Sequence, residues 1–318
     1  MKSGLVRTEM PGLQIIKTEE VFRMKLATCE YMGKEMVVVV TADESAVVPV
    51  KSLGYGFESM NELIRSTDKK MLADMAAAAG NAAETIPLAS VRLLAPIPHP
   101  VRDVVCMGLN YKAHADEMAD ALKEQRTERT WPIYFGKAVD RCRGTGEDIP
   151  SHKGFISTLD YECELAVILG RDVRDIGADE VEDCVFGYSV LNDVTGRELS
   201  RHKQNYFMKS LDGSCPMGPW IVTADEIAYP PKLRVQLSVN GEPRQDGSTA
   251  DMIFGVGEIV SELSRGVTLP AGCIFATGSP TGIGFGMNPP VFLKDGDEMV
   301  CTIEGLGTLV NTVSDSAR

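Results

Sequence analysis

The chain has 318 residues, of which 44% are hydrophobic and 24% charged, a composition typical of a soluble globular protein with one sizeable core and a smaller second domain. Its formal net charge is −13, and no cluster of basic residues with interleaved aromatics offsets this charge locally. We therefore expect neither nucleic acid nor an anionic membrane as a partner.

The eight cysteines are scattered, with no C-x-x-C pair and no Cys/His spacing of the zinc type. Several stand inside apolar runs, as Cys106 and Cys273 do, which predicts reduced thiols in a core. The first ten residues, MKSGLVRTEM, lack the apolar stretch of an export signal, and the longest hydrophobic runs have only the length of strands. These features predict a cytoplasmic protein.

Residues 1–95 are predicted to form a small α+β domain, followed by a second domain at residues 96–318. Short strands are expected at residues 13–17, 22–29 and 36–41. A helix is expected at residues 59–79, with a serine at its start and Gly80 at its end. The proline-rich connector LLAPIPHPVRD contains His99, expected at the surface, and marks the boundary between the domains.

The next segment carries the first candidate for catalysis. A strand at residues 104–109 is expected to lead into a helix at residues 111–125, with Asn110 as its N-cap. His114 and Glu117 stand three residues apart on this helix, so the carboxylate can orient the imidazole or help to activate water. Such pairs are also common on exposed helices, but a position directly after a buried strand favours a functional role.

Lys137 ends the apolar stretch WPIYFGK, which is predicted to be a strand. The lysine can meet a substrate carboxylate at this position. The commoner alternative is a surface lysine whose aliphatic stem packs along the strand.

Three carboxylates, those of Glu162, Glu164 and Asp193, are the main candidates for a functional site. Glu162 and Glu164 are two residues apart at the head of a predicted strand, so both side chains leave the same face, with Cα atoms roughly 6.5 Å apart. Ala166 and Ile168 continue that face with apolar side chains, which favours acids at the mouth of a core over a solvated edge. Asp193 closes a second apolar run. Three buried acids repel one another unless a cation joins them, so a hard ion such as Mg²⁺ or Mn²⁺ is expected.

Two basic residues follow Asp193. Arg197 suits bidentate recognition of a carboxylate, and Lys209 suits a point charge beside a metal-bound oxygen. His202 lies within a basic cluster and is expected to face water.

The last third is predicted to be rich in strands. Residues 233–239 and a partner strand are expected to meet in a hairpin at Asn240–Gly241, and residues 252–264 to form a short amphipathic helix. The strand at residues 273–276 opens onto TGSPTGIGFGMNPP, which lacks the G-K-[ST] of a phosphate-binding loop. Thr277 or Ser279 can offer a hydroxyl or an amide to an anion, although the segment also fits a plain pair of turns.

Taken together, these segments resemble the fumarylacetoacetate hydrolase family over roughly residues 94–313. The matching stretches, all in the family's order, are CMGLNYKAHADEM, LDYECELAVILGRDVRDI, GYSVLNDVTGRELS, KSLDGSCPMGPWIVT, VNGEPRQ, ATGSPTGIG and IEGLGTLVNTV. The resemblance implies a mixed α+β, β-rich fold, with a small α+β N-terminal domain and a mixed β-sandwich or β-roll in the C-terminal one. It also implies a homodimer and one Mg²⁺ or Mn²⁺ per subunit.

The resemblance also implies roles for individual residues, which fall into three groups. The implied metal ligands are Glu162, Glu164 and Asp193; the implied catalytic residues are His114, Glu117 and Lys209; and the implied contacts to a substrate carboxylate are Lys137, Arg197, Thr277, Gly278 and Ser279. His114 and Glu117 would stand on a lid helix that orders over the substrate.

The implied substrate is a 2-oxo or 2,4-dioxo acid, such as those of aromatic catabolism, and the first expectation is hydrolytic C–C cleavage of an acylpyruvate-like acid through a metal-stabilised enolate. Decarboxylation of oxaloacetate, isomerisation of a dienedioate or another lyase reaction uses the same parts, so these alternatives stay open. Ser200 stands where acylpyruvate-type members often have glutamine. A binding protein with an inactive site is a third hypothesis, which the presence of all six metal-ligand and catalytic residues disfavours.

Overall fold

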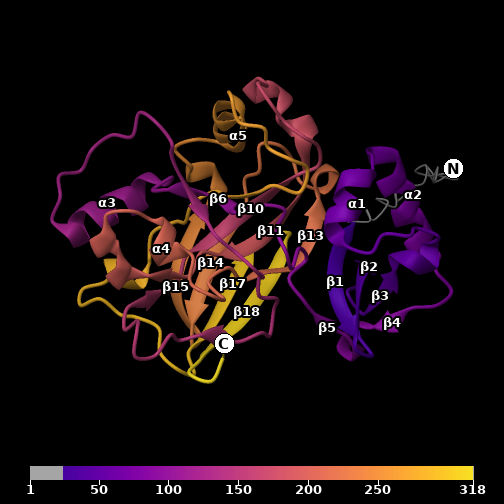
Figure 1. The fold of residues 1–318 in the computed structure, drawn as a ribbon, viewed down its shortest axis with the longest axis horizontal. Coiled ribbons are helices and arrows are strands. Elements are labelled where there is room, and N and C mark those ends of the chain that lie inside the picture. Colours follow the sequence, from indigo (N-terminus) through magenta and orange to yellow (C-terminus); the bar gives the residue numbers. More distant parts are fainter. Residues whose placement is uncertain (1–23, 318) are drawn as a thin grey trace, which may run out of the picture.

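The structure is a computed structural model that describes residues 24–317. The predicted strand at residues 13–17 lies outside this range. The described part is a mixed α+β fold rich in strands, which confirms the predicted fold class (Figure 1). No helix among residues 24–317 has the length and apolar character needed to cross a membrane.

One long sheet of 11 strands runs through the molecule. Its strands, in spatial order, are β4 (Ile86–Pro87), β3 (Ala46–Pro49), β2 (Lys34–Val40), β1 (Lys25–Tyr31), β13 (Met217–Thr223), β11 (Val185–Asn192), β10 (Cys163–Leu169), β16 (Ile274–Ala276), β6 (Val104–Gly108) and β7 (Ile133–Lys137), with β5 (Arg92–Leu93) paired to β1. Most neighbours are antiparallel, but β16 and β6 are parallel.

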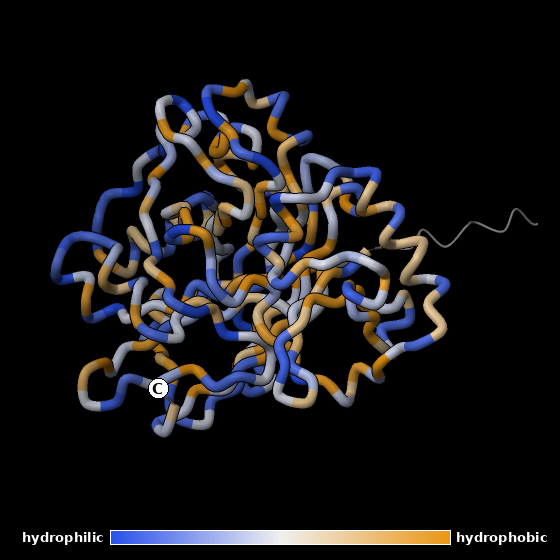
Figure 2. The backbone as a smooth tube through the Cα atoms, turned by 45° about the vertical axis from the view of Figure 1, so that its right-hand side comes forward, coloured by the Kyte–Doolittle hydropathy of each residue, from blue (hydrophilic) through white to orange (hydrophobic). Residues whose placement is uncertain are grey.

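A second sheet of five strands packs against the central strands of the first. Its strands, in spatial order, are β15 (Glu242–Ser248), β14 (Arg234–Val239), β17 (Glu298–Ile303), β18 (Gly307–Ser314) and β8 (Ile149–Pro150), and a separate short pair joins β9 (Leu159–Asp160) to β12 (Thr195–Gly196). Hydrophobic and hydrophilic stretches alternate along the backbone, and many of the outer loops are hydrophilic (Figure 2).

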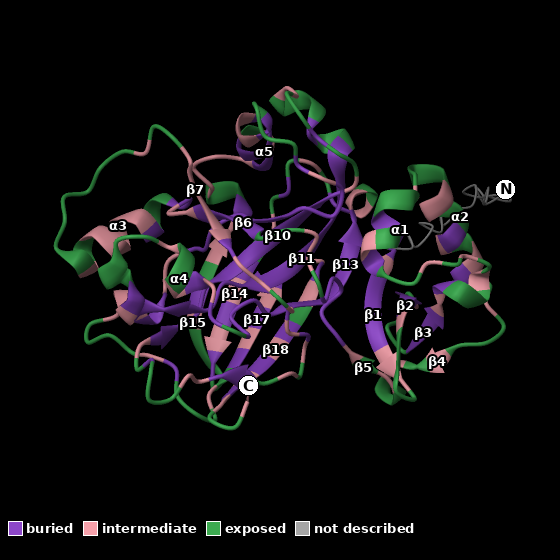
Figure 3. Ribbon diagram, viewed as in Figure 1, coloured by how far each residue is buried: buried purple, intermediate pink, exposed green. Residues whose placement is uncertain are grey.

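Strand β10 lies at the centre and is buried along its whole length (Figure 3). Leu165 and Val167 point into the core between the two sheets, because successive side chains of a strand alternate between its faces. Ala166 and Ile168 point into the core on the other face, as the sequence predicts. Glu162 and Glu164 share that second face by the same alternation.

Residues 24–317 also form five α-helices: α1 (Met60–Ser66), α2 (Lys69–Gly80), α3 (Lys112–Leu122), α4 (Tyr206–Lys209) and α5 (Val256–Ser264). The expectation of one helix over residues 59–79 is wrong, since α1 ends at Ser66 and a second helix, α2, begins at Lys69. Asp68 causes the second start, because its side chain accepts a hydrogen bond from Met71 N–H at 2.7 Å and so caps a new N-terminus.

The N-terminal strands continue the long sheet. Strand β1 pairs with β13, with Leu26 opposite Ile221, so the sheet extends without interruption from one end of the molecule to the other (Figure 1). The division of the chain at residue 95 stays a prediction.

Three other local expectations have clear outcomes. Asn240 and Gly241 both have positive φ, which confirms the predicted hairpin turn between β14 and β15. Asn110 is not the N-cap of α3: that position is Tyr111, and the Asn110 amide instead donates to the carbonyls of Phe254 and Thr277 at 3.0 and 2.9 Å. All eight cysteines are unpaired and buried, as predicted.

Candidate metal centre and active site

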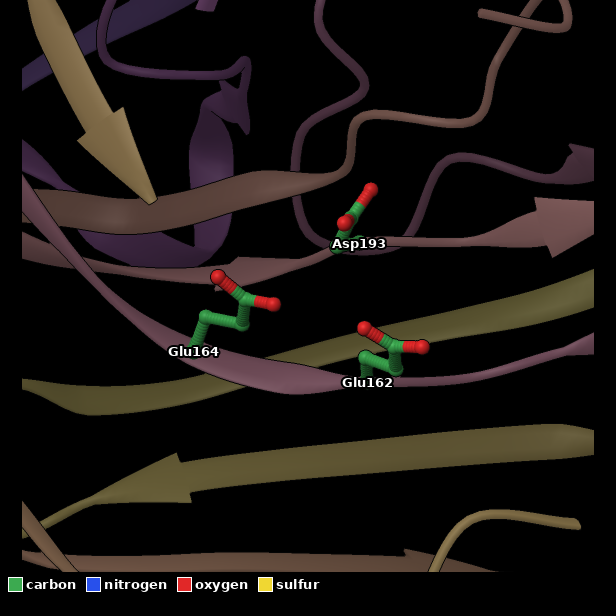
Figure 4. Close-up of side chains that lie close together, drawn as sticks. All are labelled: Glu162, Glu164 and Asp193. Atoms are coloured by element: carbon green, nitrogen blue, oxygen red, sulfur yellow. The ribbon is translucent and has the colours of Figure 1, made fainter. Parts of the chain in front are cut away.

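The three acids of the sequence converge because β10 and β11 are antiparallel neighbours. Cys163 lies opposite Asn192, which places Glu162 beside Asp193 across the strand pair, and the Asp193 N–H donates to the Glu162 carbonyl at 2.8 Å. One carboxylate oxygen from each of Glu162, Glu164 and Asp193 lies within 4.8 Å of the other two, and all three side chains are buried. Figure 4 shows them projecting into a shared space.

Buried bases hold two of these acids. Lys209 Nζ donates to Glu162 Oε2 at 2.8 Å and to Asp193 Oδ2 at 2.7 Å, so its ammonium bridges them. Arg197 Nη2 donates to the other oxygen of Glu162 at 2.6 Å. The charges of Lys209 and Arg197, and more weakly His114, outweigh the effect of burial and hold the pKa of Glu162 well below its usual range.

Lys137 differs from its expected role at a substrate carboxylate. It is fully buried, and its ammonium donates to Asp193 Oδ1 at 2.7 Å, to the Val194 carbonyl at 3.1 Å and to the Lys209 carbonyl. An ammonium has three protons, so these bonds use all of them. Lys137 therefore fixes the position of the Asp193 carboxylate and has no proton left to donate to a substrate.

Glu164 has no basic partner among residues 24–317, and its hydrogen bond comes from the Gly278 N–H at 2.7 Å. Burial and the nearby carboxylates of Asp193 and Glu162 raise the pKa of Glu164 well above its usual value. The carboxylate of Glu164 is thus the one acid of the three with no ammonium or guanidinium bonded to it among residues 24–317, and a proton or a cation would relieve the cost of burying its charge. Three hard oxygen donors within 4.8 Å of one another fit a divalent ion such as Mg²⁺ or Mn²⁺. Both oxygens of Glu162 and of Asp193 also accept hydrogen bonds from Lys209, Arg197 or Lys137, so an ion here would bind oxygens that these bases already orient.

His114 and Glu117 face the acids from helix α3. The His114 Nδ1 atom lies 3.0 Å from Glu117 Oε2, and the other carboxylate oxygen accepts from the Gly282 N–H at 2.9 Å. His114 is buried. With Nδ1 engaged by the carboxylate, Nε2 is the ring nitrogen left to exchange a proton with a ligand.

A cavity of about 140 Å³ lies between α3, the end of β6, and α4. Its polar lining consists of His114, Glu162, Arg197, Asn205, Lys209 and Ser279, and its apolar lining of Met107, Leu109, Met118, Ile133, Phe135 and Met208. His114 and Glu162 therefore line one cavity, together with Lys209 and Arg197, which contact the acids.

The turn after β16 also reaches the site. Ser279 lines the cavity, and its hydroxyl accepts from Gln245 Nε2 at 2.6 Å. Thr277 bonds to the Leu165 carbonyl through both its N–H and its hydroxyl, and Gly278 holds Glu164 as described above. Gly278 has φ +93°, and a Cβ there would lie 2.8 Å from Asn110 Cβ, so this position requires glycine.

The residue-by-residue interpretation of the sequence missed Asp160. This acid is fully buried and accepts from Arg197 Nε at 2.9 Å and from the N–H groups of Gly284 and Phe285 at 2.8 and 3.0 Å. It fixes the arginine that in turn holds Glu162. The signal was present, because Asp160 is two residues before Glu162 and an alternating pattern places both on one face.

Comparison with known proteins identifies the scaffold. Residues 103–314 match the family model described as the C-terminal part of fumarylacetoacetate (FAA) hydrolase. The chain belongs to the fumarylacetoacetate hydrolase family. Its fold is that of an enzyme of this family, whose members include hydrolases, isomerases and tautomerases.

Three members of the fumarylacetoacetate hydrolase family are closely similar. The oxaloacetate tautomerase of Bacillus subtilis is 40% identical over 304 residues, which are 91% of this chain and 100% of the relative. The fumarylacetoacetate hydrolase of Exiguobacterium antarcticum has a TM-score of 0.76 and 39% identity over 93% of this chain and 100% of that one. The maleylpyruvate hydrolase of Sphingobium sp. SYK-6, solved with manganese(II) and pyruvate, has a TM-score of 0.73 and 29% identity over 92% and 99%.

Proposed function

We propose that this protein is a divalent-metal-dependent enzyme that moves a proton on the carbon next to the oxo group of a small 2-oxo acid, as a keto–enol tautomerase does. The observation that carries the proposal is His114, which Glu117 orients and which shares a cavity of about 140 Å³ with the buried Glu162 and with Lys209. Tautomerisation needs one group that removes a proton from carbon and returns it to oxygen, and a positioned imidazole suits that task.

In this proposal Glu162, Glu164 and Asp193 hold one Mg²⁺ or Mn²⁺. A divalent ion supplies positive charge beside the oxo oxygen and so favours the enolate form of the substrate. Lys209 uses two of its three ammonium protons on the acids, which leaves one for the substrate oxygen. Arg197 and the turn of Thr277, Gly278 and Ser279 orient the substrate carboxylate, and Lys137 acts indirectly by fixing Asp193.

The dyad does the proton transfer. His114 Nε2 takes the proton from carbon, while Glu117 holds the ring through Nδ1 and stabilises the imidazolium that forms. Met107, Phe135 and Met208 form part of the apolar wall of the cavity, and displacement of water from this wall by a bound substrate would strengthen these charge interactions.

Hydrolytic C–C cleavage of an acylpyruvate-like acid is the second candidate. Its support is the similarity to two solved hydrolases, of fumarylacetoacetate and of maleylpyruvate. In that reaction His114 would deliver water to the distal carbonyl. The identities to the tautomerase and to the fumarylacetoacetate hydrolase, 40% and 39%, do not separate the two reactions. Tautomerisation ranks first because it needs only the proton transfer that His114 and Glu117 are placed to perform, whereas hydrolysis also needs a positioned water.

The test is a panel of 2-oxo and 2,4-dioxo acids assayed with Mg²⁺ or Mn²⁺. For a tautomerase, we expect the ultraviolet absorbance of the enol to decay faster with the enzyme, with no change in substrate mass. Pyruvate plus a second acid as the preferred products would replace the proposal with hydrolysis, and CO₂ with decarboxylation. A lack of turnover on every acid and with either ion would contradict all three.

We also propose that the protein works in the cytoplasm as a homodimer, with a small oxo acid as its ligand and without nucleic acid or membrane partners. The net charge of −13 supports the absence of nucleic acid. Light scattering at several concentrations tests the oligomeric state, since a monomer mass at all of them would contradict the dimer.

A further inference from the structure

The glycine-rich loop at residues 282–286 joins the dyad to the metal centre. Its Gly282 N–H donates to Glu117 on α3, and its Gly284 and Phe285 N–H groups donate to Asp160, which holds Arg197. The loop thus contacts both parts of the proposed active site. It ends in the 3₁₀ turn η8 (Gly284–Gly286), which lies against α3.

Gly286 differs from the other glycines of this loop in what a side chain there would meet. A Cβ at Gly286 would lie 2.5 Å from both Cγ and Cδ of Glu117 and 2.6 Å from its Oε1, and these are the three nearest atoms. A Cβ at Gly282 or Gly284 would instead lie 2.0 Å from a backbone carbonyl oxygen. Those two glycines are required by the backbone, whereas Gly286 leaves space for one side chain.

That side chain is the flexible end of Glu117, so a methyl group at position 286 displaces the carboxylate and leaves the backbone in place. A carboxylate that moves by about 1 Å leaves both His114 Nδ1 and the Gly282 N–H, because both bonds depend on its present position.

We propose that Gly286 is a positioning residue of the active site: the space left by its missing side chain seats the Glu117 carboxylate and thereby fixes the orientation and tautomer of His114. This inference rests on the proposed role of the dyad. It assigns a function to a glycine that touches neither the acids nor the cavity.

The first experiment compares Gly286→Ala with the unchanged chain by thermal unfolding, turnover and imidazole NMR. We expect a similar Tm, a loss of turnover of about 10²-fold, and altered ring nitrogen and Cε1 shifts for His114. Four histidines give a simple spectrum, in which His114→Gln identifies the signal. Gly80→Ala is the control, because a Cβ at this exposed helix end meets nothing within 4 Å.

The second experiment combines Gly286→Ala with Glu117→Asp, which withdraws the carboxylate by one methylene group. If the space seats Glu117, the alanine substitution costs less than about threefold in turnover in the Glu117→Asp background, since the collision is relieved. Equal costs in the two backgrounds, or His114 signals in Gly286→Ala that match the unchanged chain, would overturn the proposal. The NMR comparison decides this even if no oxo acid is turned over, so it is separate from the test of the proposed function.

Discussion

Glu164 is the best single residue with which to test the metal centre. Its carboxylate has no ion pair within residues 24–317, whereas Glu162 and Asp193 each balance buried bases. Removing either of those leaves an unpaired buried charge, which typically costs about 3–5 kcal/mol of stability. A substitution at Glu164 avoids that penalty.

We therefore predict that Glu164→Gln abolishes binding of Mg²⁺ and Mn²⁺ and reduces turnover to background, with a Tm in EDTA at or above that of the unchanged chain. The amide keeps the volume and removes the negative charge that burial opposes. Calorimetric titration with each ion measures the binding. Full turnover of the unchanged chain in EDTA would contradict the proposal that the enzyme requires a divalent ion.

His114→Ala tests the base. We predict a loss of about 10²–10⁴ in turnover with metal affinity retained, because the imidazole exchanges the proton and is not among the metal ligands proposed above. His99→Ala is the matched control, since that imidazole is exposed and bonds to the Asp140 carbonyl. A loss of turnover below about tenfold would show that His114 is not the general base.

The pairing of β1 with β13 argues against a separable N-terminal unit. Strand β13 is buried along its length, and it lies between β1 and β11. We predict that a chain lacking residues 1–95 aggregates or loses cooperative unfolding, because an unpaired apolar edge strand promotes association. Size-exclusion chromatography and thermal unfolding measure this. A monodisperse, cooperatively unfolding fragment would instead support an independent domain at residues 96–318.

Features that depend on residues close together in the sequence could be predicted, whereas features that depend on contacts between distant segments could not. The shared face of Glu162 and Glu164 and the turn at Asn240–Gly241 depend on neighbouring residues, and both were predicted. The bonds of Asn110 to Phe254 and Thr277 join segments far apart in the chain, so a local capping rule assigned it wrongly. The Asp68 cap was local, and its signal was overlooked.

The site shows the same limit. Alternation and the resemblance placed the acids and the dyad in proximity, but the burial of Lys137 behind Asp193 depends on how three segments pack around one ammonium. A side chain's charge is evident in a sequence, while the direction it points in a packed core is not. The placement of the Glu117 carboxylate against Gly286 could not be predicted for the same reason, since it depends on how helix α3 packs against a loop that is distant in the sequence.

The stability of the whole molecule should depend on pH and on the metal together. The pKa of folded Glu164 is raised above its ordinary value of 4.5, so its contribution to stability is fully present below that value and is lost as the pH rises through the folded pKa. Glu162 acts oppositely: its pKa is lowered, and its contribution is lost only as the pH falls. Above pH 4.5, the Glu164 effect therefore lowers the stability of metal-free protein as the pH rises.

We predict that the Tm difference between samples with Mg²⁺ and with EDTA grows as the pH rises, because the ion binds the ionised form of Glu164 and stabilises the folded state. Calorimetric scans across the pH range measure it. In Glu164→Gln the difference should stay near zero throughout. A difference that is independent of pH in the unchanged chain would show that Glu164 is already ionised without metal.

The burial of all eight cysteines gives the molecule an internal probe of its own opening. A thiol reagent reacts with thiolates that it can reach, and burial both hides the sulfur of Cys163 and raises its pKa. This cysteine stands between Glu162 and Glu164. The rate at which Cys163 is alkylated, measured by mass spectrometry of its peptide, therefore reports how often β10 separates from its neighbours. A bound cation should lower this rate.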